Sequence, residues 1–517
     1  MFKLGVLFFY LALPALLVIG PVTRNEGLRW ALSIVFLTVF LFRAFGPIFT
    51  GRIPQVVLGT ILVLLNAALS ASFILQGTPF NEAFFAHLDA STVSIAWKTQ
   101  PLSVLAFAAY VISAPLVLLW AGLNPVAQKL SQLMPTRRIF LLQLCSLLLC
   151  VGLSFPITAI AQHYLYIGKS SERLDATLAE LRRQSLPAQI QMAERKNIVL
   201  LYLESVEQTY FDETQFSGLL PGLSKLREDA IAFTDVVQYP GTSWTIGGLV
   251  SSQCGIPLLT RQGGNAVLEK VDNPFQSFDC LAELLGGAGY NTAFVGGASL
   301  DFAGKGRFLR DNGYQVALGL DELPTSSRHS WGMFDDELFG HARQLFDGLS
   351  KEQAPFLLTL LTLDTHHPIG TPSPSCTPYA ADASTMLNAV HCTDQLAWNF
   401  VEAIRSSDAA DDTVVVIMSD HLVISGDVVS RFDGLDRRIT FMLLDPARDA
   451  AVHSGPSSHF DVGPTILEAA GMQGVTFTFG QSLLAHPQGF LADRNLGEDD
   501  MKSFHVELLV QDRADGG

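Results

Sequence analysis

Five apolar segments in the first 161 residues constrain this chain more than any other feature of its sequence. They are Leu4–Val22, Leu28–Phe45, Ile53–Gln76, Pro101–Leu123 and Ile139–Ala161. Each is close to the roughly 20 residues that an α-helix needs to cross a bilayer. Only 16% of the 517 residues are charged, and the mean hydropathy is +0.31. We therefore predict a transmembrane domain of five helices over residues 1–162. A cleaved signal peptide is the alternative for the first segment, but four more segments follow it.

The Lys and Arg residues of the short loops predict the orientation of these helices. With the N-terminus in the cytoplasm, the cytoplasmic loops carry the excess of positive charge. The cytoplasmic set is Lys3, Arg43, Arg52, Lys129, Arg137 and Arg138, and the exported set is Arg24, Arg29 and Lys98. An odd number of spans then places everything after Ala161 outside the cytoplasm.

Beyond Asn197, short runs of branched apolar residues alternate with helix-like segments. The predicted strands are Ile198–Leu203, Thr292–Val295, Phe356–Thr362, Val414–Met418 and Ile439–Leu444, and the predicted helices include Leu223–Ala230, Leu281–Gly289 and Met333–Leu349. This alternation is typical of a mainly parallel sheet with helices on both faces. We expect a linker helix over residues 163–196, the α/β domain over residues 197–487 and a polar tail over residues 488–517.

Polar side chains follow the predicted strands at the points where the strands end. Glu204 follows the first strand, Asp364 and His366 follow Phe356–Thr362, and Asp420-His421 follow Val414–Met418. In open α/β sheets, ligands bind beyond the carboxyl ends of the strands. A carboxylate after a strand is often only a helix cap. The joint placement of these residues instead predicts a site for a divalent ion, which oxygen and imidazole ligands suit.

Thr242 lies at the predicted start of a further helix. The segment YPGTSWTIGGLV begins with a Pro-Gly turn, and its apolar residues have helical spacing. A helix cap is the simpler interpretation of Thr242. The alternative uses the same geometry, because the start of a helix stabilises an anion such as phosphate. A threonine next to a metal ion could then act as a nucleophile. Ser243 and Thr245 are rivals, although Thr245 lies nearly a full turn further in.

Four cysteines fall in the exported part of the chain. They are Cys254, Cys280, Cys376 and Cys392. An even number outside the cytoplasm predicts two disulfides. Three pairings are open, and the cost of loop closure favours Cys254 with Cys280 and Cys376 with Cys392. The net charge of −16 argues against nucleic acid as a partner.

The order of these residues along the chain resembles that of the site residues in the alkaline-phosphatase/sulfatase superfamily. The matching stretches are LYLESVEQTYFD, QYPGTSWTIGGLVSSQCGIPLL, FAGKGRFLRDNGY, LTLDTHHP and SDHL, between about Asn197 and Ala470. Within the superfamily the chain is most similar to the membrane-anchored phosphoglycerol transferases that decorate osmoregulated periplasmic glucans, and it resembles lipoteichoic acid synthase. The resemblance implies a sulfatase/alkaline-phosphatase-like α/β domain that is periplasmic and anchored in a bacterial inner membrane.

The resemblance also implies roles for individual residues. Glu204, Thr242, Asp420 and His421 would hold one divalent ion, with Mn²⁺ expected and Zn²⁺ or Mg²⁺ as alternatives. Thr242 would be the nucleophile, and His366 would contact the phosphate or act as acid and base. The implied substrate-binding residues are Lys305, Arg307, His367 and Trp331, and the further candidates are His459 and Asp364.

The implied activity is the transfer of a glycerophosphoryl group from phosphatidylglycerol to a periplasmic glucan or oligosaccharide. The group would pass through a covalent threonine intermediate, with release of diacylglycerol. Two alternatives stay open: a phosphoethanolamine transferase that acts on a glycan or lipid A, and a non-catalytic membrane sensor. Cys254 stands in Cys-Gly-Ile-Pro, whereas sulfatases need Cys-x-Pro-x-Arg, so sulfate-ester hydrolysis is disfavoured. The sequence predicts no oligomeric state.

Overall fold

The computed structural model describes most of the chain after residue 170. The described residues are 105, 108, 171–184, 191–192, 195–259, 268, 278–380, 383–424, 426 and 428–504. The predicted membrane helices therefore lie outside them, apart from residues 105 and 108 of the fourth. Within the described part of the chain, no helix is both long enough and apolar enough to cross a bilayer.

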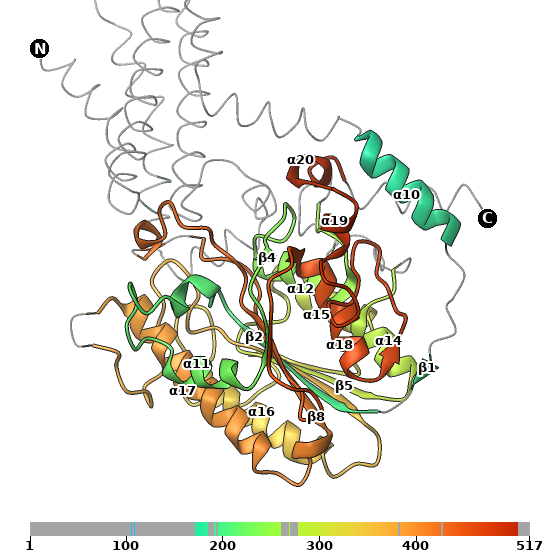
Figure 1. The fold of residues 1–517 in the computed structure, drawn as a ribbon. Helices are drawn as coiled ribbons and strands as arrows, with labels where there is room; N and C mark the ends of the chain where they lie inside the picture. The colour runs from blue at the N-terminus through green and yellow to red at the C-terminus, as the bar shows by residue number, and fades with distance from the viewer. Residues whose placement is uncertain are drawn as a thin grey trace, which may run out of the picture. The chain divides into compact units, whose positions relative to one another are not determined.

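An eight-stranded sheet forms the centre of the described domain (Figure 1). Its order is β10-β3-β9-β8-β2-β7-β5-β6. The strands are β2 (Asn197–Leu203), β3 (Ile231–Phe233), β5 (Asn291–Gly296), β6 (Val316–Leu318), β7 (Phe356–Leu361), β8 (Thr413–Ser419), β9 (Phe441–Leu444) and β10 (Ala451–His453). The predicted mainly parallel sheet is confirmed.

One strand, β9, runs against its two neighbours. It pairs antiparallel with both β8 and β3, whereas the other neighbouring pairs of this sheet are parallel. A parallel neighbour needs a crossover connection, usually through a helix, that returns the chain to the same end of the sheet. The described residues between β8 and β9 form only a short 3-10 helix, η4 (Val429–Arg431), so the chain re-enters the sheet from the end at which it left.

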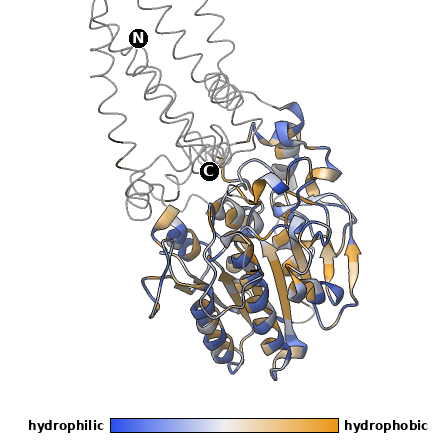
Figure 2. Cartoon of the chain, turned by 90° about the vertical axis from the view of Figure 1, so that its left-hand side faces the viewer, coloured by the Kyte–Doolittle hydropathy of each residue, from blue (hydrophilic) through white to orange (hydrophobic). Residues whose placement is uncertain are grey.

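The four central strands are buried along almost their whole length. In β2, β5, β7 and β8 every residue is buried except the first residue of β2 and of β5. Figure 2 shows these strands as an apolar layer between helices whose outer faces are hydrophilic. Continuous Val, Ile and Leu runs are typical of parallel strands that are covered on both faces.

Helices cover both faces of the sheet, as predicted. One face carries α11 (Pro221–Glu228), α16 (Asp335–Leu349) and α17 (Thr385–Arg405), and the other carries α12 (Thr245–Cys254), α14 (Leu281–Gly287) and α18 (Val462–Ala469). The alternation of side chains along β2 supplies both faces. Val199 and Leu201 belong to the core under the first group of helices. Tyr202 points the other way, and its hydroxyl lies 2.7 Å from Ser252 Oγ on α12.

Smaller elements complete the domain. They are α10 (Glu172–Gln184), α15 (Lys305–Asp311), α19 (Phe490–Asp493), α20 (Glu498–Met501), η1 (Gln208–Phe211), η2 (Phe302–Gly304), η3 (Ala410–Asp412) and η5 (His459–Asp461), with the paired strands β1 (Gln191–Met192) and β12 (Met472–Gln473), and β4 (Val236–Val237) and β11 (Ser457–Ser458). The folded chain extends past the boundary predicted at Pro487, because Phe490, Met501 and Phe504 are buried. The polar residues between them hide this apolar contribution in the sequence.

Both expected disulfides are present. Cys254 at the end of α12 is bonded to Cys280 at the start of α14, and Cys376 is bonded to Cys392 of α17. The first disulfide therefore ties together two helices on one face of the sheet. The second ties the connection after β7 to a helix on the opposite face.

A partly buried ion pair joins the connection after β8 to the loop after β2. Arg437 Nε donates to the two Glu207 carboxylate oxygens at 2.9 and 3.1 Å, and Arg437 Nη2 donates to the Val423 carbonyl at 2.7 Å. Glu207 also accepts the Val423 N–H at 3.0 Å. The Glu207 side chain is 0% exposed, so without Arg437 its charge would be buried and unpaired.

We expect Arg437→Leu to lower the free energy of unfolding by about 3–5 kcal/mol, as is usual when one partner of a buried ion pair is removed. The matched control is Arg405→Leu, because Arg405 pairs with Asp229 at 3.1 Å on the surface, where the two side chains are 35% and 61% exposed. That change should cost less than about 1 kcal/mol. Chemical denaturation of both variants measures the difference, and equal losses would contradict the prediction.

Candidate active site

The carboxyl ends of the parallel strands bring the predicted site residues together. The register pairs Leu203 of β2 with Ser419 of β8, so Glu204 and Asp420 leave the sheet side by side. Glu204, Asp420 and His421 each offer a ligand atom within 4.8 Å of the others, and the three residues are buried. His421 Nε2 lies 3.3 Å from Glu204 Oε1 and 3.5 Å from Asp420 Oδ2.

The donor atoms of this cluster fit a divalent ion. Asp420 Oδ1 accepts the backbone N–H groups of Ser205 and His421, both at 2.9 Å, whereas the buried Oδ2 has no hydrogen-bond partner among the described residues. His421 Nδ1 lies 2.8 Å from the Leu422 carbonyl, which can only accept, so Nδ1 carries the proton. In the neutral imidazole, Nε2 is therefore the nitrogen that could bind a metal ion, and it lies close to two carboxylate oxygens. Carboxylate and imidazole donors in this combination suit Mn²⁺ or Zn²⁺.

The charges of the three groups are strongly coupled. Burial raises the pKa of Asp420 to about 7, and the Glu204 carboxylate adds to this effect. Burial lowers the pKa of His421, but Asp420 and Glu204 outweigh it and raise that pKa to about 9. Burial also raises the pKa of Glu204, and the charges of His421 and His366 reverse this, so that its pKa falls well below the usual range. A cation stabilises such a concentration of buried carboxylates.

The start of α12 adjoins this cluster. Thr245, the first residue of α12, donates its hydroxyl to Glu204 Oε2 at 3.2 Å. Gly248 packs so closely on Asp420 that an added Cβ would lie 2.1 Å from the Asp420 carbonyl oxygen. Thr242 is fully buried, and its hydroxyl donates to the Tyr239 carbonyl at 2.8 Å. The N-cap of α12 is Trp244, so Thr242 does not cap the helix, and the simpler interpretation of this residue is wrong.

Lys305 lies within the electrostatic reach of the cluster. It is the first residue of α15 and is buried. Burial lowers its pKa to about 8, and the charges of Glu204 and Asp420 oppose this shift. The two residues before it, Ala303 and Gly304, have φ angles of 57° and 66°, and they turn the chain sharply into α15. Arg307, the second predicted basic contact, forms an ion pair at 3.4 Å with Asp311 on the same helix.

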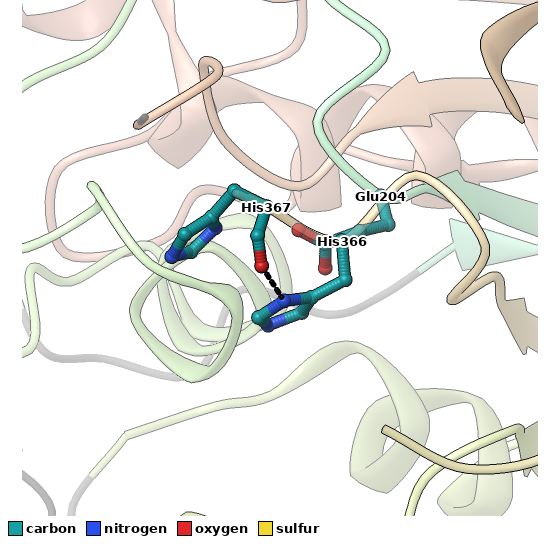
Figure 3. Close-up of side chains that lie close together, drawn as sticks. All are labelled: Glu204, His366 and His367. Atoms are coloured by element: carbon teal, nitrogen blue, oxygen red, sulfur yellow. Dashed lines mark hydrogen bonds between the residues drawn. The ribbon is translucent and has the colours of Figure 1, made fainter. Parts of the chain in front are cut away.

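Aromatic rings border the cluster on the side of β7. The ring of His366 lies 3.9 Å from that of Trp331 and 4.6 Å from that of His367, measured between centroids. His366 Nδ1 donates to the His367 carbonyl at 2.8 Å. Figure 3 shows both histidines beside the Glu204 carboxylate. The structure therefore brings His366, His367 and Trp331 to one place.

Asp364 and His459 support neighbouring segments. Asp364 Oδ1 accepts the N–H of Asp335 at 3.1 Å, and Asp335 in turn accepts the N–H groups of Leu363 and Asp364, so the pair joins the start of α16 to the end of β7. Burial raises the pKa of Asp364 to about 7. His459 Nε2 donates to the Asp420 carbonyl at 2.8 Å and therefore holds the backbone of this ligand.

Sequence reasoning named Thr245 only as a rival nucleophile, and it assigned no role to two other residues of the site, Ser205 and His329. Ser205 and Thr245 both contact Glu204, and the His329 Nε2 lies 3.6 Å from Asp364 Oδ1. A turn signal and a strand end lie near the first two, but nothing in the sequence separates them from neighbouring hydroxyl residues. His329 stands in an irregular segment without periodicity, so the sequence gives no sign of its position.

A family model described as Sulfatase matches residues 196–472, which is more than half of the chain. The chain belongs to the sulfatase family. The fold agrees with this: a protein of the alkaline phosphatase superfamily from Vibrio parahaemolyticus aligns with a TM-score of 0.52 and 22% identity, over 62% of this chain and 80% of that one.

Curated relatives of this sulfatase-family chain share the name phosphoglycerol transferase I. The protein from Xanthomonas euvesicatoria pv. vesicatoria (strain 85-10) is 36% identical over 322 residues, which are 59% of this chain and 46% of the relative. The protein from Salmonella arizonae (strain ATCC BAA-731 / CDC346-86 / RSK2980) is 38% identical over 267 residues, which are 50% of this chain and 35% of the relative. The match thus spans less than half the length of these relatives.

Proposed function

We propose that this sulfatase-family protein is a metal-dependent phosphoglycerol transferase. It takes glycerophosphoryl groups from phosphatidylglycerol in the membrane and transfers them to a periplasmic glucan or another glycan. The observation that carries the proposal is the buried cluster of Glu204, Asp420 and His421 against the start of α12. The name of the relatives supports the choice of donor. The two disulfides support an exported catalytic domain, because such bonds persist in oxidising compartments.

Four residues of this chain would hold the ion, namely Glu204, Asp420, His421 and Thr242, and Mn²⁺ is the expected metal. When bound, the ion supplies Lewis-acid stabilisation of the phosphoryl oxygens and lowers the pKa of the Thr242 hydroxyl. The positive end of the α12 dipole and the Lys305 ammonium group would further stabilise the negative charge on the phosphoryl oxygens. The five predicted membrane helices would keep the domain at the leaflet that presents the lipid headgroup.

The reaction has two displacement steps at phosphorus. The Thr242 hydroxyl oxygen attacks the phosphodiester phosphorus, the bond from phosphorus to the diacylglycerol oxygen breaks, and the threonine proton passes through His366 Nε2 to that oxygen. A glycan hydroxyl then attacks the phosphoryl-threonine, the bond from phosphorus to Thr242 breaks, and the glycan proton returns to Thr242 by the same route. The products are diacylglycerol and a glycerophosphoryl glycan.

The charge of Lys305 gives this mechanism an expected pH dependence. With its pKa lowered to about 8 by burial, Lys305 is an ammonium group below that pH and neutral above it. The transfer rate should therefore fall as pH rises through about 8. Lys305→Arg keeps its charge, since arginine has a pKa above about 12, and should remove this decline. Rates of lipid consumption on both sides of this pH test the prediction, and an unchanged decline in Lys305→Arg would contradict it.

Intact-protein mass spectrometry after incubation with phosphatidylglycerol and Mn²⁺ tests the proposed function. We expect a gain of one glycerophosphoryl unit on the native chain and none on Thr242→Ala. Peptide mapping should place the group on Thr242 and not on Ser243 or Thr245. A gain only with phosphatidylethanolamine would replace the donor and keep the mechanism. No covalent gain with either lipid, together with no lipid consumption, would reject the transferase in favour of a non-catalytic protein.

A further inference from the structure

Ser205 contacts three of the four residues that the proposed function assigns to metal binding. They are Glu204, Asp420 and His421, and Thr242 is the fourth. Its hydroxyl donates to Glu204 Oε1 at 2.9 Å and lies 3.4 Å from His421 Nδ1. Its backbone N–H donates to Asp420 Oδ1 at 2.9 Å. The residue is buried, and it follows Glu204 directly at the end of β2.

The Ser205 hydroxyl connects two of these residues in a defined direction. The proton on His421 Nδ1 is shared between the Leu422 carbonyl at 2.8 Å and the Ser205 oxygen. Because the Ser205 oxygen accepts a hydrogen bond from the histidine, its own O–H group can donate a hydrogen bond to Glu204 Oε1. Only a group that both accepts and donates can make this link, and a hydroxyl does so. The Leu422 carbonyl sets the tautomer of His421, and the Ser205 hydroxyl adds a second contact to the same ring nitrogen and orients the Glu204 carboxylate.

The backbone of Ser205 orients the third residue. Its φ of 56° lies in the left-handed region, which serine rarely adopts and glycine adopts freely. In this conformation the N–H groups of Ser205 and His421 both donate to Asp420 Oδ1, and Oδ2 accepts no hydrogen bond from any residue in the described part of the chain. Strained residues of this kind cluster at functional sites.

We propose that Ser205 is a positioning residue that presents the ligand atoms of Glu204, Asp420 and His421 to a divalent cation. The inference rests on the proposed function only for the existence of the metal site. Ser205 acts on the ion through its three neighbours and takes no part in phosphoryl transfer. Its left-handed backbone and its hydroxyl serve separate tasks, so the two can be tested separately.

The test compares Ser205→Gly with Ser205→Ala in the full chain, in detergent micelles and without lipid. Both changes remove the hydroxyl, but glycine relieves the left-handed strain and alanine keeps it. We expect both variants to bind Mn²⁺ about 10–100-fold more weakly, as is usual when a partner of a metal ligand is lost. The metal-free Tm of Ser205→Gly should equal or exceed that of the native chain. Electron paramagnetic resonance of free Mn²⁺ gives the affinities, and thermal unfolding gives the Tm values.

A control separates this role from ordinary buried hydrogen bonding. Ser251 is fully buried on α12, and its hydroxyl donates to the Ile256 carbonyl at 3.0 Å. Ser251→Ala should lower the Tm and leave the Mn²⁺ affinity unchanged. Native affinity in Ser205→Gly, or an affinity loss that follows the Tm in all three variants, would overturn the proposal. A native chain that binds Mn²⁺ but transfers no group would reject the proposed function, while weaker binding by Ser205→Gly would still support this inference.

Discussion

Thr242→Ala is expected to lower phosphatidylglycerol turnover by at least about 1,000-fold, because an alanine offers no oxygen to form the covalent intermediate. Thr242→Ser keeps the hydroxyl and should retain part of the activity. The native side chain is buried, and its hydroxyl bonds to the Tyr239 carbonyl, so the smaller alanine should fit without disturbing α12. Release of labelled diacylglycerol measures the rates.

Thr245→Ala is the matched control for that experiment. Thr245 is the first residue of α12 and donates to Glu204 Oε2 at 3.2 Å, so its loss should weaken metal binding while the nucleophile stays in place. Added Mn²⁺ should restore much of the activity of Thr245→Ala and none of that of Thr242→Ala. Equal rescue of the two variants would show that Thr242 is not the nucleophile.

Asp420→Asn is expected to weaken Mn²⁺ binding by at least about 100-fold, since it removes the carboxylate whose Oδ2 accepts no hydrogen bond from the described residues and lies in the cluster. The native chain should gain about 2.7 kcal/mol of stability when free Mn²⁺ is at 100 times its Kd, and the variant should gain almost none. Thermal unfolding with and without Mn²⁺ measures this difference.

Asp394→Asn controls for the removal of a buried carboxylate. Asp394 lies on α17 and accepts the N–H groups of Gly222 and Leu223 at 3.0 and 2.6 Å, away from the ligands. This variant should lose stability and yet keep its full response to Mn²⁺. If Asp420→Asn responded to Mn²⁺ as the native chain does, the metal site would have to lie elsewhere.

Local patterns in the sequence were enough to predict the central strands and the position of the site. The run TVVVIMS predicts a strand over Val414–Met418, and β8 spans Thr413–Ser419. Once the sheet is taken as parallel, the residues after β2 and β8 must meet at one edge, so Glu204 and Asp420-His421 could be placed together without coordinates. The cysteine pairing also followed, because short loops close at the lowest entropic cost.

The features that only the tertiary structure decided depend on contacts between segments that are distant in the sequence. The Ser205 N–H meets Asp420 across 215 residues of sequence, and no periodicity or turn signal near either residue predicts that bond. The burial of Phe504 has the same origin, since it depends on which surfaces remain to be covered after the central strands have paired. The sequence by itself determined which side chains supply the chemistry, because strand ends and turns are local. Only the packed fold decided which hydroxyl groups and backbone N–H groups orient those side chains, because such bonds form after distant segments have come together.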